Sequence, residues 1–130
     1  MSSANSSRSI SRIPITVELV NKGNIDCEMI RHLAPVTVSK ILKGLPIQDR
    51  IHRFKDQFIY IQTGLEIGAE KPKTKFKLGD VGFMTSNGAV CFFLKDSTVS
   101  AMSHVGILKE GIELIGSARP GDVIVMRSMP

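Results

Sequence analysis

The alternation of hydrophobic and polar positions along the chain predicts a series of short β-strands. Between residues 13 and 20, Ile15, Val17 and Leu19 alternate with polar side chains, which is the period of two typical of a half-buried strand. Residues 25–31 repeat this alternation after the sequence Asn-Lys-Gly-Asn, which favours a hairpin turn. Further strands are predicted at residues 57–63, 81–84, 89–94, 105–108 and 123–126.

The strand predicted at residues 57–63 has two different faces. Ile59 and Ile61 point to one side of it, whereas Phe58, Tyr60 and Gln62 point to the other. A face built from Phe, Tyr and Gln is amphipathic and differs from a plain core face.

Two short helices and one long connection separate these strands. Residues 35–45 place apolar side chains at helical spacing, with Pro35 suited to the first turn and a Gly and a Pro that end the helix. We expect this helix to plug one end of the sheet. A second short helix is predicted at residues 110–117, and residues 64–78 are predicted to form a loop that carries four lysines.

The predicted strands number about seven or eight and are joined mostly by short hairpins. This arrangement is typical of a mainly β protein built as an antiparallel barrel rather than as an alternating α/β sheet. The length of 130 residues suits a single domain, which we assign to residues 13–130. Residues 1–12 are Ser-rich and basic without a hydrophobic stretch, so we predict a disordered tail rather than a secretory signal.

Composition argues against several kinds of protein and site. No apolar run approaches the roughly 20 residues that span a bilayer, and we predict a cytoplasmic protein that does not act at a membrane. Cys27 and Cys91 lie in apolar strands and are expected to be reduced and buried. Because His32, His52 and His104 are scattered without metal-ligand spacing, we expect no metal and no other cofactor.

The net charge of +5 raises the alternative of a nucleic-acid partner. Lys71, Lys73, Lys75 and Lys77 recur with a period of two, which fits the solvated face of a strand or hairpin arm, or an extended loop. Aromatic residues make up only 5% of the chain, and no base-stacking motif is present. Nucleic-acid binding through the lysine-bearing segment therefore remains a secondary hypothesis.

Short motifs occur in a characteristic order along the chain. They are Ala-Pro-Val-Thr at 34–37, Ile-His-Arg-Phe at 51–54, Asn-Gly at 87–88, Cys-Phe-Phe-Leu at 91–94 and Val-Gly-Ile-Leu-Lys-Glu-Gly at 105–111. In this order and spacing, the chain from about residue 13 to residue 127 resembles the cyclophilin family, and especially the compact cyclophilin-like proteins of bacteria and archaea. The resemblance implies a closed antiparallel β-barrel of about eight strands with two short helices.

The resemblance also implies a reaction. Cyclophilins catalyse rotation about Xaa–Pro bonds, whose uncatalysed barrier is about 18–20 kcal/mol because the amide bond has partial double-bond character. The reaction requires a groove that binds the twisted transition state better than either planar isomer, and it needs neither a metal nor a nucleophile. By its His-Arg context, Arg53 matches the catalytic arginine of the family, which would hydrogen-bond the twisted amide.

A ligand-binding groove on the outer face of the barrel is the second implication of the resemblance. Tyr60 and Gln62 match the wall of this groove, and Phe93 matches its floor. One extra residue between Arg53 and Gln62 leaves Phe58 or Ile59 as an alternative for the pocket position of Tyr60.

Other groove positions depart from the family pattern. Met84 is a candidate for the apolar rim, and His104 lies two or three residues later than the groove histidine of the family. The chain has no Trp, and Cys91 stands where the family has a second groove glutamine.

Two functional hypotheses follow. The first is a prolyl isomerase, which requires Arg53 to face the same groove as Tyr60 and Phe93. The second is a non-catalytic module that binds a proline-containing peptide or a small ligand in that groove, and the departures from the family pattern favour it. No Ser-His-Asp, Cys-His or paired-carboxylate arrangement supports an unrelated chemistry. Apolar strand edges are compatible with a homo-oligomer, although nothing specifies one.

Overall fold

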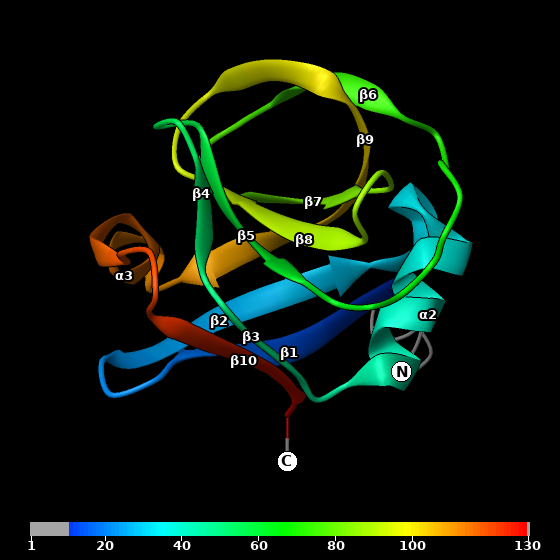
Figure 1. Cartoon of the computed structure of the whole chain (residues 1–130). Coiled ribbons are helices and arrows are strands. Elements are labelled where there is room, and N and C mark those ends of the chain that lie inside the picture. Colours follow the sequence, from blue (N-terminus) through cyan, green and yellow to red (C-terminus); the bar gives the residue numbers. More distant parts are fainter. Residues whose placement is uncertain (1–10, 130) are drawn as a thin grey trace, which may run out of the picture.

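The computed structural model describes residues 11–129. It contains ten strands, two α-helices and one turn of 3-10 helix (Figure 1). The strands are β1 (Arg12–Leu19), β2 (Gly23–Ile30), β3 (Ile47–Arg50), β4 (His52–Phe54), β5 (Phe58–Gln62), β6 (Lys73–Phe76), β7 (Asp80–Met84), β8 (Ala89–Phe93), β9 (Ser97–Glu110) and β10 (Val123–Ser128). The helical segments are η1 (Arg31–Leu33), α2 (Pro35–Gly44) and α3 (Ile112–Ser117).

Nine strands form one antiparallel sheet in the order β3-β10-β1-β2-β9-β7-β8-β5-β4, and β6 pairs with β9 off this path. The sheet is strongly curled. Its two edge strands are β3 and β4, which are consecutive in the chain and separated by Ile51 alone. The chain therefore passes from one edge of the sheet to the other at Ile51, whose N–H donates to the Asp122 carbonyl at 2.7 Å.

The predicted mainly β architecture with two short helices is confirmed, but the closed barrel of about eight strands is not. The sheet system has ten strands, and within residues 11–129 no backbone ladder joins β3 to β4 or β5. The contact between β3 and β5 instead uses a side chain, because the Gln62 N–H donates to Asp49 Oδ2 at 2.8 Å.

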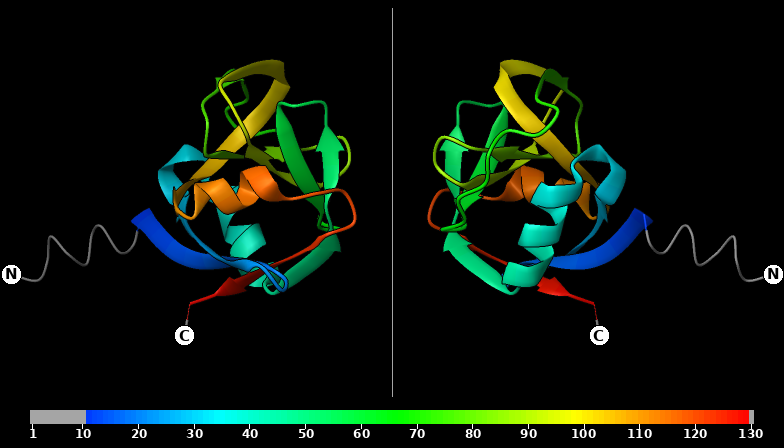
Figure 2. Two further views of the ribbon diagram at one scale, coloured as in Figure 1. Left: turned by 90° about the vertical axis from the view of Figure 1, so that its left-hand side faces the viewer. Right: turned by 90° about the vertical axis from the view of Figure 1, so that its right-hand side faces the viewer.

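The main core fills the inside of the curled sheet. The apolar faces predicted for the first two strands are buried there, as are Ile59 and Ile61 of β5. Helices α2 and α3 cover opposite ends of the sheet, as the two side views show (Figure 2). Val38 and Ile41 of α2 and Ile115 of α3 enter the core, so the expectation that the first helix plugs one end is confirmed.

A second apolar cluster, the outer cluster, lies on the opposite face of β5 and β8. Its buried members are Phe58, Phe76, Cys91, Phe93 and Met102. The two different faces predicted for residues 57–63 are therefore confirmed. In Figure 1, β6 and the first half of β9 arch over β5, β7 and β8, and this arch covers the outer cluster.

Three differences from the predicted strands concern this arch and the sheet edges. Residues 73–76, for which the lysine pattern left a strand or an extended loop open, form β6, and the strand predicted at 105–108 is the end of the much longer β9. Lys and Thr make up most of residues 73–76, and residues 97–104 alternate irregularly between polar and apolar side chains, so neither stretch has the strong apolar alternation that identifies a strand. The short edge strands β3 and β4 were also not predicted.

The predicted tail lies largely outside the described residues, since residues 1–10 are not described. Arg12, which the prediction assigned to the tail, begins β1 and pairs with Ile30, and its guanidinium lies 3.0 Å from Glu28 Oε1. In residues 11–129 no helix is long and apolar enough to cross a membrane.

The connection from β5 to β6 is fixed by Glu70. Its carboxylate accepts hydrogen bonds from the backbone N–H groups of Val36 and Thr37, at 3.1 and 2.9 Å, and from the Thr37 hydroxyl at 2.9 Å. It thereby caps α2, because Ala34 at the N-cap position makes no side-chain cap bond. Burial alone would raise the pKa of Glu70, but these hydrogen bonds and the charge of Lys71 outweigh it and hold the pKa below its usual value.

We expect Glu70→Ala to lower the free energy of unfolding by about 1–2 kcal/mol, because it removes a helix cap and leaves its donors without an acceptor. The control is Glu66→Ala, which removes an exposed carboxylate from the same connection. Urea unfolding followed by circular dichroism measures both, and equal losses for the two variants would contradict the capping role.

Candidate functional site

A cleft of about 660 Å³ opens onto the outer cluster. Its apolar lining consists of Phe54, Phe58, Met84, Val99 and Met102, and its polar rim includes Lys55, Gln57, Thr85, Ser86, Thr98 and Ser100. These residues come from the β4–β5 turn, the β7–β8 turn and the first half of β9. The volume falls within the range of about 300–1,000 Å³ that is typical of small-ligand pockets.

A stack of aromatic rings supports the wall of the cleft. The ring centroid of Phe58 lies 5.1 Å from that of Phe93, and Phe93 stacks in parallel on Phe76 at 4.6 Å. Gly82 on β7 leaves room for the Met102 side chain beside these rings, since a Cβ there would lie only 2.7 Å from the Met102 sulfur. The rings are therefore held in place by close packing before any ligand arrives.

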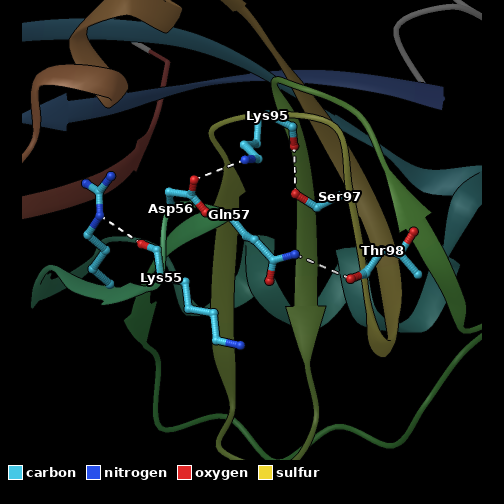
Figure 3. Close-up of polar contacts among 7 residues, drawn as sticks. Lys55, Asp56, Gln57, Lys95, Ser97 and Thr98 are labelled. Carbon is cyan, nitrogen blue, oxygen red and sulfur yellow. Dashed lines mark hydrogen bonds and ion pairs between the residues drawn. The ribbon is translucent and has the colours of Figure 1, made fainter.

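Polar contacts at the mouth of the cleft join the β4–β5 turn to the start of β9 (Figure 3). Asp56 Oδ2 lies 3.0 Å from Lys95 Nζ, and Gln57 Nε2 donates to the Thr98 carbonyl at 3.4 Å. The hydrogen bond and charge of Lys95 lower the pKa of Asp56. Because the Asp56–Lys95 pair is solvent-exposed, it is a weak tether that can break and re-form at little cost.

Arg53 does not line the cleft. In the β4–β5 ladder Arg53 is paired with Ile59, whereas His52 is paired with Tyr60. Residues paired in an antiparallel ladder share a face of the sheet, so Arg53 and Tyr60 lie on opposite faces of this hairpin. The Arg53 side chain is exposed, and its Nε donates to the Lys55 carbonyl at 2.9 Å. The geometry thus gives its catalytic assignment no support.

Of the other residues predicted for the groove, some lie in or next to the cleft and some do not. Phe58 and Met84 line the cleft itself. Phe93 is fully buried beneath Phe58, and Tyr60 is half-buried and packs against the outer cluster. Gln62 is exposed at the end of β5 and lies outside the cleft lining.

His104 lies in a neighbouring pocket instead of the cleft. A bulge in the β7–β9 ladder pairs it with Gly82, and its ring meets Phe76 edge-on at 5.6 Å. Its Nε2 lies 3.4 Å from Asp80 Oδ1. Burial alone would raise the pKa of Asp80, but hydrogen bonds from His104 and from the Lys77 N–H, with the nearby positive charges, lower it overall.

The sequence reasoning missed several cleft residues, among them Phe54, Lys55, Gln57, Val99 and Met102. The sequence shows Phe54 only as an apolar residue directly before the polar segment Lys-Asp-Gln, and the structure is needed to place it, 41% exposed, at the cleft. The β9 residues carried no signal, since their place at the cleft depends on the long-range pairing of β9 with β6 and β7.

The two thiols are not poised for nucleophilic chemistry. Cys27 and Cys91 are free and buried. Burial, with a smaller contribution from the charge of Glu28, raises the pKa of Cys27 to about 12, and burial likewise raises the pKa of Cys91. Since the thiolate is the reactive form, both remain inert thiols at neutral pH. Within residues 11–129, no group of three or more His, Cys, Asp or Glu side chains could hold a metal ion.

Comparisons with known proteins agree with the observed fold. The solution structure of the hypothetical protein AF2241 from Archaeoglobus fulgidus is similar at a TM-score of 0.76 and 25% sequence identity, over 92% of this chain and 96% of that chain. The structure of McbB in complex with tryptophan is similar in fold, at a TM-score of 0.73 and 15% identity over 88% of this chain and 44% of that chain. No curated protein matches the sequence significantly. Residues 11–127 match the family described as Cyclophilin-like, and the chain therefore belongs to the cyclophilin-like family.

Proposed function

We propose that this protein binds an apolar group, carried by a proline-containing peptide or by a small molecule, in the cleft over the outer cluster. The observation that carries the proposal is the cleft of about 660 Å³, walled by Phe58, Met84 and Met102. A preformed apolar concavity with a few polar rim groups is the usual form of a small-ligand site.

The chemistry of the lining suits such a ligand. Phe54 and Phe58 stack at 5.0 Å and offer flat apolar surface, while Met84 and Met102 have flexible side chains that adapt to irregular shapes. Lys55 and Gln57 on the rim can donate hydrogen bonds to a peptide carbonyl or a carboxylate. That a neighbour of the same fold, McbB, is in complex with tryptophan makes an aromatic amino acid a sensible first probe.

Binding without isomerisation is the form of the proposal that we favour. Isomerisation needs a cation that hydrogen-bonds the twisted amide within the groove. Arg53, the residue assigned to this role by resemblance, lies on the opposite face from Tyr60 and is not part of the cleft lining. Lys55 does line the cleft, but its ammonium is a mobile point charge without the planar geometry of a guanidinium. Family membership keeps isomerase activity as the second candidate.

The binding test uses two probes, an Ala-Pro-containing peptide without Trp or Tyr and free tryptophan. Tyr60 is the only tyrosine and the chain has no Trp, so its fluorescence reports peptide binding beside the cleft. Methyl NMR shifts of Met84 and Met102 report both probes. We expect saturable shifts, and we expect Met84→Gln to weaken binding by about tenfold because a buried amide loses hydrogen bonds to water.

The matched control is Met129→Gln, which makes the same substitution at a position that is 47% exposed and outside the cleft. It should leave the affinity unchanged. Absence of saturable shifts with both probes, or equal weakening by the two substitutions, would overturn the cleft as the binding site.

Isomerase activity is measured on the same peptide by NMR exchange between its cis and trans forms. We expect no acceleration over the uncatalysed exchange, which takes tens to hundreds of seconds. Acceleration that is lost in Arg53→Ala but kept in Arg50→Ala would establish the isomerase instead. Arg50 is a suitable control because it is likewise an exposed arginine, on the neighbouring strand β3.

We also propose that the protein works in the cytoplasm. In support, Cys27 and Cys91 are unpaired thiols, as is usual where the environment is reducing. Alkylation with and without prior reduction of protein taken directly from its source cells checks this, because oxidised thiols would argue for another compartment.

A further inference from the structure

A second concave pocket of about 770 Å³ lies beside the cleft, and three lysines are among its lining residues. Its lining includes Lys73, Lys75 and Lys77 together with Asp80 and His104; Phe76, Asp96, Ser97 and Thr98 complete it. We call it the lysine pocket. Thr98 also lines the cleft, so the two cavities adjoin at β9.

Backbone N–H groups occupy one oxygen of each carboxylate in the lysine pocket. The Lys77 N–H donates to Asp80 Oδ2 at 2.8 Å, and the Leu78 N–H donates to Asp96 Oδ1 at 2.9 Å. The other oxygen of Asp80 lies 3.4 Å from His104 Nε2. Both acids therefore hold the turn between β6 and β7, Asp80 also contacts the imidazole of His104, and neither acid forms an ion pair with a lysine of the pocket.

The three lysines outnumber the two carboxylates of the pocket, so positive charge is in excess there. Among residues 11–129, four other basic residues pair with carboxylates at 2.8–3.0 Å, namely Arg12, Lys22, Lys95 and Arg127. Lys73, Lys75 and Lys77 form no ion pair with any described residue, and Lys73 Nζ instead lies over the Phe76 ring, 4.9 Å from its centroid. Like charges gathered round a concavity focus a positive potential into it.

We infer that the lysine pocket is a binding site for the anionic group of a small molecule, a phosphate or a carboxylate. The concave shape and the volume of about 770 Å³ fit a compact ligand better than a long nucleic-acid strand. Each ammonium group supplies three donors and a full charge, and the Thr98 side chain on the pocket wall adds a hydroxyl group. This site does not rest on the function proposed for the cleft.

Protection of an edge strand is the alternative explanation of these lysines. Strand β6 pairs with β9 alone, so its other edge is open, and lysines on an open edge discourage pairing with a second molecule. This role would explain Lys73 and Lys75 without any ligand. It predicts self-association when the lysines are removed and no specific effect on anion binding.

The experiment titrates the full chain with inorganic phosphate and, separately, with citrate, followed by ¹H–¹⁵N NMR at low ionic strength. A short single-stranded DNA forms a third arm. We expect saturable shifts confined to residues 73–77, 96–98 and 104 with phosphate or citrate, and the tighter of these two identifies the anionic group. The triple variant Lys73→Gln, Lys75→Gln, Lys77→Gln should weaken binding by about tenfold or more, because it removes three nearby charges.

The matched control replaces Lys40, Lys43 and Lys109, which are all exposed and lie outside the pocket, by Gln. It changes the net charge equally, so equal weakening in both triple variants would show a general charge effect and overturn the site. A single variant, Lys75→Glu, repeats the test with less risk to folding and should also weaken binding.

Two further outcomes would overturn the inference. One is the absence of saturable shifts at the pocket with either small anion. The other is tight DNA binding whose shifts extend well beyond the pocket and whose affinity falls steeply with salt, since that would mark an extended nucleic-acid surface.

Discussion

Gly106→Ala is expected to lower the free energy of unfolding by about 3 kcal/mol, through a clash that the backbone cannot relieve. A Cβ on Gly106 would lie 2.3 Å from the Glu28 carbonyl oxygen and 3.2 Å from the Met29 Cα. Both atoms belong to the backbone of β2, which is itself paired to β1. The β2–β9 ladder would therefore have to open, and the melting temperature should fall by roughly 10 °C for a domain of this size.

The control for this prediction is Gly116→Ala in α3, where a new Cβ meets nothing within 4 Å. Alanine is the better helix former, so this change should be neutral or stabilising by up to about 1 kcal/mol. Differential scanning calorimetry of both variants provides the measurement. A Gly106→Ala protein that melts like the native one would mean that the two strands are not as close as described.

Phe92→Ala is expected to produce the second large effect, a loss of about 3–5 kcal/mol in the free energy of unfolding. Phe92 is fully buried in the main core, where its ladder partners are Val81 and Ile59. The substitution would leave a cavity in the interior of the curled sheet, which cannot collapse easily because α2 and α3 cover both ends.

Phe54→Ala makes the same chemical change at the cleft and serves as the contrast. Phe54 is 41% exposed and stacks on Phe58 alone among the described aromatic rings, so we expect a loss of no more than about 1 kcal/mol. Ligand binding in the cleft should nevertheless weaken. Chemical denaturation and the binding assay thus separate the two positions, and similar losses of stability would contradict the exposed position of Phe54 at the cleft.

Much of the fold could be predicted because the alternation of apolar and polar residues within each strand is visible in the local sequence. The alternation of Ile15, Val17 and Leu19, and the opposed faces of Phe58 and Ile59, follow from a period of two that burial enforces. The first helix likewise begins at Pro35 as predicted. These features depend on a few neighbouring residues, which is the information that a single sequence carries best.

The remaining features depend on contacts between distant segments. The alternating lysines were compatible with a strand at β6 as well as with a loop, and the pairing with β9, a distant segment, decides between them. The bulge that pairs His104 with Gly82 likewise has no recognisable pattern in the local sequence. Two of the seven residues predicted for the site, Phe58 and Met84, line the cleft. Arg53 was assigned from its sequence motif, but the face of the sheet on which its side chain lies depends on the register of the β4–β5 hairpin.

The order of strands in the sheet has a consequence for the synthesis of this protein. Within residues 11–129, strand β10 lies between β1 and β3, and it is the only ladder partner of β3. While residues 123–128 are still inside the ribosomal tunnel, the nascent chain leaves β3 unpaired and one edge of β1 open. Such edges invite pairing with other chains, so this chain must avoid aggregation until β10 has left the tunnel and can pair with both β1 and β3.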